Sequence, residues 1–536
     1  MIDFVRANMA PLMFGGLILF MLIGYPAAFS LSAVGLFFGI AALQFHLIEP
    51  EFLGNLSFQL YGVLANDLLL AIPFFTLMGA ILERCGLAED LLDGFGQLFG
   101  GVRGGLSYAV ILVGAVLGAI TGTVAASVIA MGLISLPVMQ RYGYSVRHAT
   151  GVIAASGTIT QLIPPSLVLI VLANQLGRSV GDMYLGATGA SILQLALFAG
   201  WVLILSIVRP QDVPALPLEA RTLRGTALAA KLVKGMVPSL ALIFIVLGTI
   251  FLGLVTPTEA GAMGVVGAMF LAWINGRLTW PLIWEGMVST TKLTAMVVFI
   301  LLGSRVFSLV FQGVGGSHWI ESMLTSLPGG QVGFLVFVNL FIFVMAFFLD
   351  FFEIAFIVIP MLAPVASHLG IDLIWFGVLI CVNMQTSFMH PPFGFALFYL
   401  RSVAPREAYI DKITKRRMEP ITTGQIYWGA VPFVLIQILM VGLIIAFPKL
   451  VSSGLGKEPT VDVDKAFQQM QMQSKDAKPD PAAPAIDAAS GSASAASADA
   501  SGSSPSAGDE GYGKGSDDDA MKRLLESMQK DAPKKP

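Results

Sequence analysis

Three features of the sequence predict an all-α polytopic membrane protein, whose helices cross a membrane many times. Of its 536 residues, 56% are hydrophobic and 12% are charged, whereas an ordinary soluble domain carries about 25% charged residues. Apolar segments of spanning length follow one another as far as residue 450, and Gly and Pro interrupt them at related positions in two halves. The net charge of −3 gives no overall basic field, so nucleic acid is not expected as a partner.

The N-terminal apolar run, Met9 to Phe45, is longer than the hydrophobic part of a signal peptide and is expected to stay in the lipid bilayer. Tyr25-Pro26 interrupts this run, which is therefore either one kinked span or two short ones. Further segments of roughly spanning length lie near 57–83, 104–136, 145–177, 186–208, 236–275, 286–312, 333–364, 372–400 and 426–447. We therefore expect ten or more crossings.

A Pro-rich and then basic linker divides the membrane part into two halves. Residues 1–208 form the first half, 209–235 the linker and 236–450 the second half. Because short cytoplasmic loops carry an excess of Lys and Arg, the linker is expected in the cytoplasm. Residues 451–536 form a polar tail that lacks the apolar surface needed to offset the entropy of ordering, and it is expected to be disordered. A short amphipathic island near 521–530 is either a transient helix or a docking motif.

An internal repeat relates the two halves. Adding 227 to the residue number carries four Gly and Pro residues onto residues of the same type: Pro137 to Pro364, Gly143 to Gly370, Pro164 to Pro391 and Pro165 to Pro392. Each half has, in order, an amphipathic stretch, an apolar run with a polar interruption, a loop, and an apolar segment broken by a double proline. The amphipathic stretches are Leu87 to Phe99 and His318 to Leu327. We interpret each half as a re-entrant helical hairpin followed by a broken helix.

The polar interruptions predict a binding site. They are Thr121-Gly122-Thr123 and Gly157 to Ser166 in the first half, and Asp350 to Glu353 and Asn383 to Pro392 in the second. An unsatisfied backbone group costs several kcal/mol inside a bilayer, so such breaks are buried in protein or line a cavity. Paired breaks are typical of a transporter's midplane site, where carbonyl and side-chain oxygens suit sodium and half-helix N-termini suit an anion. The alternative is that small residues here only permit close helix packing.

The distribution of basic residues predicts that the two repeats are inverted. If 104–136 and 333–364 are hairpins that enter and leave on one side, most basic loop residues fall on the linker's side: Arg84, Arg103, Arg141, Arg147, Arg277, Arg401, Arg406, Lys412, Lys415, Arg416 and Arg417. Outside remains chiefly Arg178. The first hairpin then opens from the cytoplasm and the second from the outside, and the last span sends the tail outside.

Five blocks carry a family resemblance: GAITGTVAASVIAMGLISLPVM, ATGVIAASGTITQLIPPSLVLIV, VTPTEAGAMGVVGA, LDFFEIAFIVIPMLAPV and NMQTSFMHPPFGFALF. Together they resemble the large membrane subunit of the tripartite ATP-independent periplasmic (TRAP) transporters, within the ion transporter superfamily, over residues 1 to about 450. The resemblance implies an elevator-type secondary transporter in a bacterial inner membrane, not an enzyme, with sodium as the coupling ion and no other cofactor. It also implies two partners, a small four-helix membrane subunit and a periplasmic substrate-binding protein, and the chain looks like the unfused form.

The resemblance also implies the positions of the binding residues. The first sodium site would use Thr121, Gly122, Thr123, Gly157, Thr158 and Thr160, and the second Asp350, Asn383, Gln385, Thr386 and Ser387. Substrate candidates are Arg305, Ser166, Glu353 and His390. Many relatives have Asp-Pro-Thr where this chain has Asp350-Phe351-Phe352-Glu353, and an apolar residue or Thr in place of His390. These departures suggest the mannitol/chloroaromatic subgroup and a small organic acid, a 2-oxo or 2-hydroxy monocarboxylate, as substrate.

Three charged or titratable residues leave alternatives open. Arg305 lies inside an apolar span, and it is a carboxylate ligand, an ion-pair partner of Glu353 or Asp350, or a snorkelling surface residue. His390 either couples transport to protons or is a satisfied buried histidine. Glu259 is expected to fix a helix start after Thr256-Pro257-Thr258.

Two other function classes are weighed against the sodium-coupled carrier. A proton-coupled or ATP-energised carrier is the closer alternative, but the sequence has no P-loop. A membrane-embedded lipid enzyme would need a cluster of acidic, basic or metal-binding residues, whereas the five histidines are scattered and no HExxH or Asp-rich motif occurs.

Overall fold

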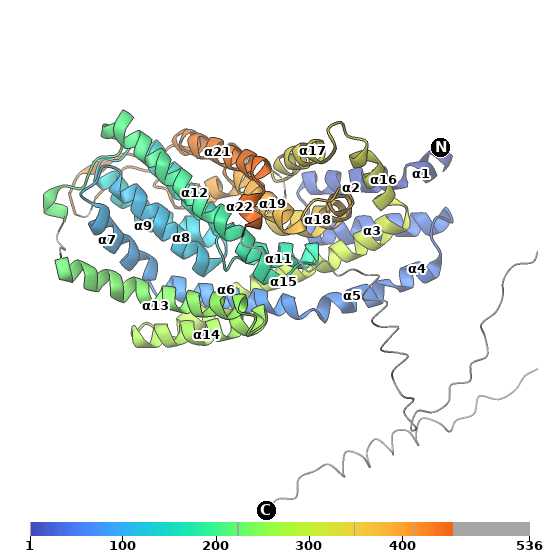
Figure 1. Ribbon diagram of the computed structural model, residues 1–536, viewed down its shortest axis with the longest axis horizontal. Helices are drawn as coiled ribbons and strands as arrows, with labels where there is room; N and C mark the ends of the chain where they lie inside the picture. The colour runs from blue at the N-terminus through green and yellow to red at the C-terminus, as the bar shows by residue number, and fades with distance from the viewer. Residues whose placement is uncertain (1, 222–224, 348, 412, 454–536) are drawn as a thin grey trace, which may run out of the picture. The chain divides into compact units, whose positions relative to one another are not determined.

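The computed structural model describes residues 2–221, 225–347, 349–411 and 413–453 (Figure 1). Lys412 and the predicted disordered tail, with its island near 521–530, lie outside the described residues, except that the last described helix continues to Ser452. Apart from one antiparallel pair, β1 (Tyr409–Ile410) and β2 (Arg417–Met418), the regular structure of the described residues is helical. The predicted all-α class is confirmed.

The helices of the first half are α1 (Ile2–Ala7), α2 (Met9–Ile23), α3 (Ala27–Gln44), α4 (Pro50–Gly54), α5 (Leu56–Leu64), α6 (Asp67–Arg84), α7 (Leu87–Phe99), α8 (Gly105–Thr121), α9 (Val124–Arg141), α10 (Val146–Thr158), η1 (Ile159–Gln161), α11 (Leu167–Leu176) and α12 (Val180–Val208). The linker contains the short turns η2 (Pro210–Asp212) and η3 (Leu218–Ala220). The helices of the second half are α13 (Gly225–Phe251), α14 (Pro257–Ile274), α15 (Trp280–Gly313), α16 (Gly316–Thr325), α17 (Gly330–Met345), α18 (Phe351–His368), α19 (Leu373–Met389), α20 (Phe395–Val403), α21 (Thr423–Ala446) and α22 (Lys449–Ser452).

Within the described residues, eight helices are long and apolar enough to cross a membrane, or up to 10 if each of two bent helix pairs is one span. The expected ten or more crossings are reached only at the upper figure, because several apolar segments are divided into helices of 10–17 residues, including α2, α8, α11 and α19. The N-terminal run forms two helices, α2 and α3, which are separated at Gly24 and Pro26 and pack against each other. The sequence had left this choice open.

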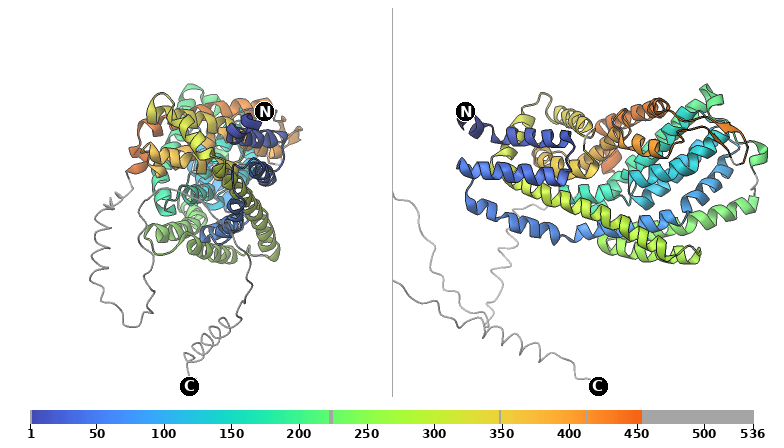
Figure 2. Two further views of the ribbon diagram at one scale, coloured as in Figure 1. Left: turned by 90° about the vertical axis from the view of Figure 1, so that its right-hand side faces the viewer. Right: turned by 180° about the vertical axis from the view of Figure 1, so that it is seen from behind.

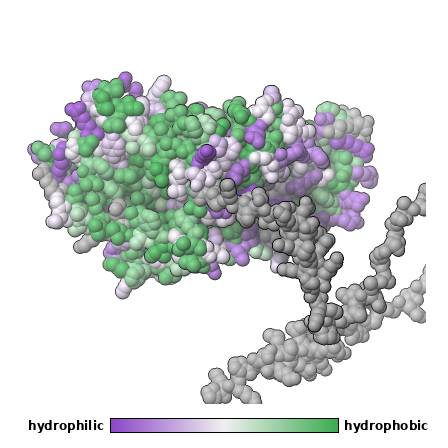
Figure 3. Space-filling model, in the orientation of Figure 1, coloured by the Kyte–Doolittle hydropathy of each residue, from purple (hydrophilic) through white to green (hydrophobic). Residues whose placement is uncertain are grey.

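The exposed surface over the long helices is apolar. Large hydrophobic side chains of α12 and α14, such as Ile204, Ile207 and Phe270, are more than half exposed. Figure 3 shows hydrophobic residues spread over the middle of this face and hydrophilic residues toward its left and right ends. Because water would oppose so large an apolar surface, lipid is the solvent that fits these helices.

The predicted repeat is visible in the order and packing of the helices. Elements α6 to α12 correspond in order to α15 to α21, and the hairpin helices α9 and α18 are followed by Gly143 and Gly370, both with positive φ. Contacts are reciprocal, because α3 packs on α15 and α14 on α6, while α9 packs on α20 and α18 on α11. In Figures 1 and 2, α6, α13, α14 and α15 form one layer, and the hairpins and broken helices form another beside it. Each hairpin thus leans on the half-helix of the other repeat.

The linker packs against the predicted cytoplasmic end of the first hairpin. The backbone N–H of Ser145 donates to the carbonyl of Asp212, and that of Leu216 donates to the carbonyl of Gly100, both at 2.9 Å. Nearby, the Arg141 guanidinium donates to the Asp411 carboxylate at 2.9 to 3.1 Å. Basic residues of distant loops therefore gather at one end of the helices, as the charge pattern predicts.

The buried ion pair at this end sets a pH dependence. Hydrogen bonds from Arg141, together with those from Thr414, hold the pKa of Asp411 well below its usual range. A depressed pKa gives stability that is present above the unfolded pKa of about 3.9 and is lost only as the pH falls through the lower folded value. Asp411→Asn should therefore lower the free energy of unfolding by about 2 kcal/mol, equally at pH 5 and pH 8, measured as the melting temperature of the purified chain.

Glu419→Gln is the matched control, because Glu419 meets Arg417 at 3.8 Å on the surface, where such pairs contribute little. Equal melting temperatures for the two variants would contradict the assigned role of Asp411.

Candidate functional site

The first hairpin reverses direction at Gly122, whose φ of +62° favours glycine. Small residues bring this hairpin against the first broken helix: a Cβ on Gly118 would lie 2.8 Å from the Thr160 Cα atom. The Thr121 hydroxyl lies 2.7 Å from the Ser127 hydroxyl, a partner that the sequence analysis did not identify. The predicted tip residues therefore lie at a tight turn pressed onto the break.

The first break runs from the end of α10 to the start of α11 and carries its own helix cap. The Ser166 hydroxyl donates to the carbonyl of Gln161 at 2.6 Å and accepts from the N–H of Val168 at 3.2 Å. It therefore bridges the two half-helices and satisfies one backbone group on each side. The Ser166 hydroxyl thus already has two backbone partners and does not line the cavity described below. A substrate role for Ser166 stays a prediction.

The second hairpin tip is stabilised by a capping box. Asp350 accepts from the N–H of Glu353 at 3.0 Å, and Glu353 accepts from the N–H of Asp350 at 2.9 Å. The signal was present in the sequence, because an Asp followed three residues later by Glu is a capping-box pattern. The same pattern was predicted for Glu259 and is confirmed there by its reciprocal bonds with Thr256. The structure thus gives Asp350 and Glu353 a structural role that is independent of ligand binding.

The second broken helix is attached to its own hairpin. Asn383 donates to the carbonyl of Asn339 at 2.7 Å, and Ser387 donates to that of Phe343 at 3.4 Å, so one face of α19 is tied to α17. The His390 ring stacks on Phe347 at 4.7 Å and meets Phe343 edge-on at 5.1 Å, and its buried Nδ1 atom has no hydrogen-bond partner.

The other predicted sodium ligands lie deeper in the helix packing. Gly157 faces Val128, where a Cβ would lie 2.2 Å from a methyl carbon. Thr158 accepts from Gln437 at 3.2 Å, and Thr386 donates to its own helix. The hydroxyl of Thr160 and both amide atoms of Gln385 are buried without a hydrogen-bond partner. Gly157 thus fits the packing interpretation, whereas the orphaned polar atoms of Thr160 and Gln385 leave room for a ligand.

A cavity of about 220 Å³ lies where both hairpin tips and both breaks meet. Its lining is formed by Gly122, Thr123, Val124, Ala125, Gln161, Val168, Leu293, Met296, Asp350, Phe351, Phe352, Phe388, Phe395 and Tyr399. Three predicted residues are brought together here, Gly122, Thr123 and Asp350. Gln161 was missed as a candidate, although it is 2% exposed and its Oε1 atom has no hydrogen-bond partner.

The internal repeat runs through this cavity. Adding 227 carries five lining residues onto five others: Thr123 to Asp350, Val124 to Phe351, Ala125 to Phe352, Gln161 to Phe388 and Val168 to Phe395. The same offset relates Gln161 to Phe388, and each lies three residues before a double proline. The sequence therefore held a signal that both positions belong to the breaks. The cavity therefore lies at the interface of the two repeats.

Backbone groups supply the positive electrostatics of the cavity. The first turns of α9, α11, α18 and α20 all contribute to its lining. Side chains cap α11 and α18, but neither Thr123 nor Gly394 caps its helix, so the N-termini of α9 and α20 keep free donors. No Lys, Arg or His is among the lining residues that the structure describes. An anion bound here would meet helix dipoles and not basic side chains.

Arg305 does not belong to this lining. It follows the lining residue Met296 by nine residues on α15, which is about two and a half turns at 3.6 residues per turn. Arg305 therefore lies on the opposite face of the helix from Met296. Among the described residues it forms no ion pair with Asp350 or Glu353. The described residues also hold no group of three His, Cys, Asp or Glu side chains suited to a transition metal, so a cation here would rely on carbonyl, hydroxyl and carboxylate oxygens.

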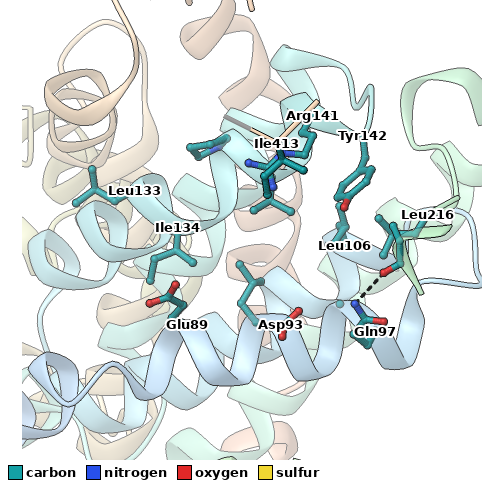
Figure 4. A pocket seen from close by; sticks show the side chains of 15 residues that line it. Glu89, Asp93, Gln97, Leu106, Leu133, Ile134, Arg141, Tyr142, Leu216 and Ile413 are labelled. Carbon is teal, nitrogen blue, oxygen red and sulfur yellow. Dashed lines mark hydrogen bonds between the residues drawn. The ribbon is translucent and has the colours of Figure 1, made fainter. Parts of the chain in front are cut away.

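A larger cavity of about 540 Å³ lies between α7, the first hairpin and the linker (Figure 4). Two of its three charged lining residues have partners: Arg141 pairs with Asp411, and Asp93 pairs with Lys231. The related hollow between α16 and the second hairpin, lined by Trp319, Phe341 and other apolar residues, measures only about 60 Å³. Neither of these two spaces reaches a hairpin tip or a break. The cavity of about 220 Å³ between the repeats is therefore the candidate binding site.

Comparisons with known proteins agree with this architecture. A family model described as "Tripartite ATP-independent periplasmic transporter, DctM component" matches residues 14–450. The C4-dicarboxylate TRAP transporter large permease protein DctM of Pseudomonas aeruginosa is 33% identical over 364 residues, or 68% of this chain and 83% of that protein. The sialic acid TRAP transporter large permease protein SiaM of Vibrio cholerae is 27% identical over 381 residues, or 71% of this chain and 86% of that protein.

A solved structure supports the fold. The YdaH transporter of Alcanivorax borkumensis matches with a TM-score of 0.50 and 14% sequence identity, covering 75% of this chain and 90% of that chain. At this identity the similarity concerns the fold alone. Together with the family match, it confirms the predicted class of two inverted repeats, each with a re-entrant hairpin and a broken helix.

Two variants can distinguish the capping role of Glu353 from a role of its negative charge in binding. Glu353→Gln should keep the cap, whereas Glu353→Ala should lower the free energy of unfolding by about 1 kcal/mol, because only the first supplies an acceptor for the Asp350 N–H. Melting temperature and the apparent substrate affinity of both variants provide the test. Glu259→Gln and Glu259→Ala are matched controls in a second capping box. Equal loss of affinity in both Glu353 variants would show that the charge itself binds substrate.

Proposed function

Because the chain belongs to the DctM component family of the tripartite ATP-independent periplasmic transporters, we propose that it is the large permease subunit of a sodium-coupled importer of a small organic acid. The chain is a permease and not an enzyme, as its curated relatives are large permease proteins. The observation that carries the proposal is the cavity where four helix N-termini converge at the interface of the repeats.

An anionic substrate fits the electrostatics of this cavity. Free backbone donors at the starts of α9 and α20 attract a carboxylate, and Thr123 and Gln161 add side-chain donors. A volume of about 220 Å³ lies below the roughly 300–1,000 Å³ typical of pockets for drug-sized ligands, which favours a small acid. We infer a 2-oxo or 2-hydroxy monocarboxylate, in keeping with the departures at Asp350–Glu353 and His390 that suggest the mannitol/chloroaromatic subgroup.

Sodium coupling follows from the charge balance of the site. Asp350 lines the cavity, so an anionic substrate would lie near a carboxylate with no basic side chain among the described lining residues. Such a pair of negative charges needs a cation between them. Oxygens of Asp350, Thr123 and Gln161, with carbonyls freed at the breaks, are the hard ligands that sodium prefers. Further candidate sodium ligands, which do not line the cavity, are Thr160, Asn383 and Gln385.

Elevator motion is supported by the unequal spaces behind the hairpins. The space beside α7 and the first hairpin measures about 540 Å³, while the related space beside α16 and the second hairpin measures about 60 Å³. In an inverted repeat, exchanging these two arrangements would carry the central cavity from one side of the membrane to the other. We place the chain in the bacterial inner membrane.

Two partners complete the proposed transporter. Large permeases of this family work with a small membrane subunit and a periplasmic binding protein, and we propose that a separate four-helix subunit and a binding protein that delivers the acid act with this chain. Proton coupling is the alternative, because His390, with its unpartnered Nδ1, and the Asp350–Glu353 pair both lie near the second hairpin tip.

The decisive measurement is uptake of labelled pyruvate and lactate into proteoliposomes that hold the chain, its small subunit and its binding protein, with and without an inward sodium gradient. We expect sodium-dependent uptake that falls at least about tenfold in Thr123→Ala and Asn383→Ala, because each loses a polar ligand near a charge. Thr188→Ala is the control, since the Thr188 hydroxyl bonds only within α12.

Uptake that depends on a proton gradient and on pH between 6 and 8, but not on sodium, would contradict sodium coupling. It would instead indicate proton coupling through His390, Asp350 or Glu353. Arg305→Lys should leave the apparent affinity unchanged, because Arg305 lies away from the cavity; a large loss would restore its role as a carboxylate ligand.

A further inference from the structure

The two repeats give the central cavity two unlike halves. The first repeat contributes small and polar residues: Thr123, Val124, Ala125, Gln161 and Val168. At the positions related by 227 the second repeat contributes Asp350 and four phenylalanines: Phe351, Phe352, Phe388 and Phe395. One half therefore presents side-chain hydrogen-bond donors, and the other presents rings and one carboxylate, while each half contributes one uncapped helix start, α9 or α20.

The rings that line the cavity include two contacting pairs, here called the aromatic wall. Phe351 and Phe352 meet edge to face with centroids 5.1 Å apart, and Phe388 and Phe395 lie 5.6 Å apart. Tyr399 extends the wall one turn along α20. Phe351 and Phe388 are buried, so their rings are held in place before any ligand binds. Such a wall favours an apolar or aromatic group, and its phenylalanine rings offer no hydrogen bond to a second charged group.

We propose that this aromatic wall is the specificity-determining subsite of the cavity, and that it selects a monocarboxylate whose body is a branched apolar or aromatic group. This inference rests on the proposed function. The carboxylate lies in the first-repeat half, near Gln161 and the start of α9, and the apolar body lies against Phe352, Phe388 and Phe395. A second carboxylate in the second-repeat half would lie against the rings and beside Asp350, whose negative charge opposes the backbone donors at the start of α20. Dicarboxylates are therefore rejected, and polyhydroxylated acids would leave hydroxyls without partners.

A series of acids that differ in their apolar group tests the subsite. Binding is measured on the purified full chain with its small subunit in detergent and sodium, without the binding protein, because the binding protein would impose its own selectivity. The probes are pyruvate, 4-methyl-2-oxopentanoate, phenylpyruvate and succinate. We expect the affinity to rise from pyruvate to the two larger acids by at least about tenfold, and no binding of succinate.

Two variants that copy residues of the first repeat into the second test whether the rings cause the preference for larger acids. Phe352→Ala and Phe395→Val install the residue types that the first repeat has at the related positions, and each should lower the affinity for phenylpyruvate at least about tenfold while changing that for pyruvate little. Phe398→Val is the control, because Phe398 lies on the same helix but is 48% exposed and outside the lining.

The ligand series on the unaltered chain decides the proposal even if a variant fails to fold. Pyruvate or succinate binding as tightly as phenylpyruvate would overturn the aromatic subsite while leaving an organic-acid permease. If none of the four acids binds and none is taken up, the proposed function fails together with the subsite.

Discussion

The structure depends on one constraint, which is that backbone groups inside a bilayer must find partners within the protein. One broken helix and one hairpin tip meet it locally: Ser166 bridges the first break, and Asp350 and Glu353 satisfy each other's N–H groups at the second tip. The starts of α9 and α20 are the exceptions, because no side chain caps them. Those starts line the cavity, so their backbone donors are open to the ligand that we propose.

Repetition and divergence explain how one site serves both halves. Reciprocal packing of each hairpin on the other repeat's half-helix brings two distant segments into a single cavity. The divergence is concentrated at equivalent positions, where the first repeat has Ala125 and Gln161 and the second has Phe352 and Phe388. A symmetric site would offer the same chemistry twice, whereas this one separates a polar head group from an apolar body. Chemical asymmetry thus arises on a framework of two related repeats.

Side-chain roles were harder to predict than the fold. The offset of 227 predicted two hairpins and two breaks because Gly and Pro mark backbone geometry directly. The capping pattern predicted Glu259 correctly, and the same pattern at Asp350 was not used because a charged residue in an apolar span suggests a ligand first. Arg305 was a reasonable candidate for the same reason, but helical phase turns it away from the cavity. Local patterns give the position of a residue along the chain, not the direction of its side chain.

The sequence by itself determined the class of protein, the repeat, the places where helices break and the family, because hydropathy, Gly and Pro act over a few residues and need no knowledge of neighbours. Only the tertiary structure decided that the N-terminal run is two helices, that Gly157 packs against Val128 and that Gln161 lines the cavity. Those outcomes depend on which surfaces meet when the helices pack, and on the close approach that small residues such as Gly118 allow.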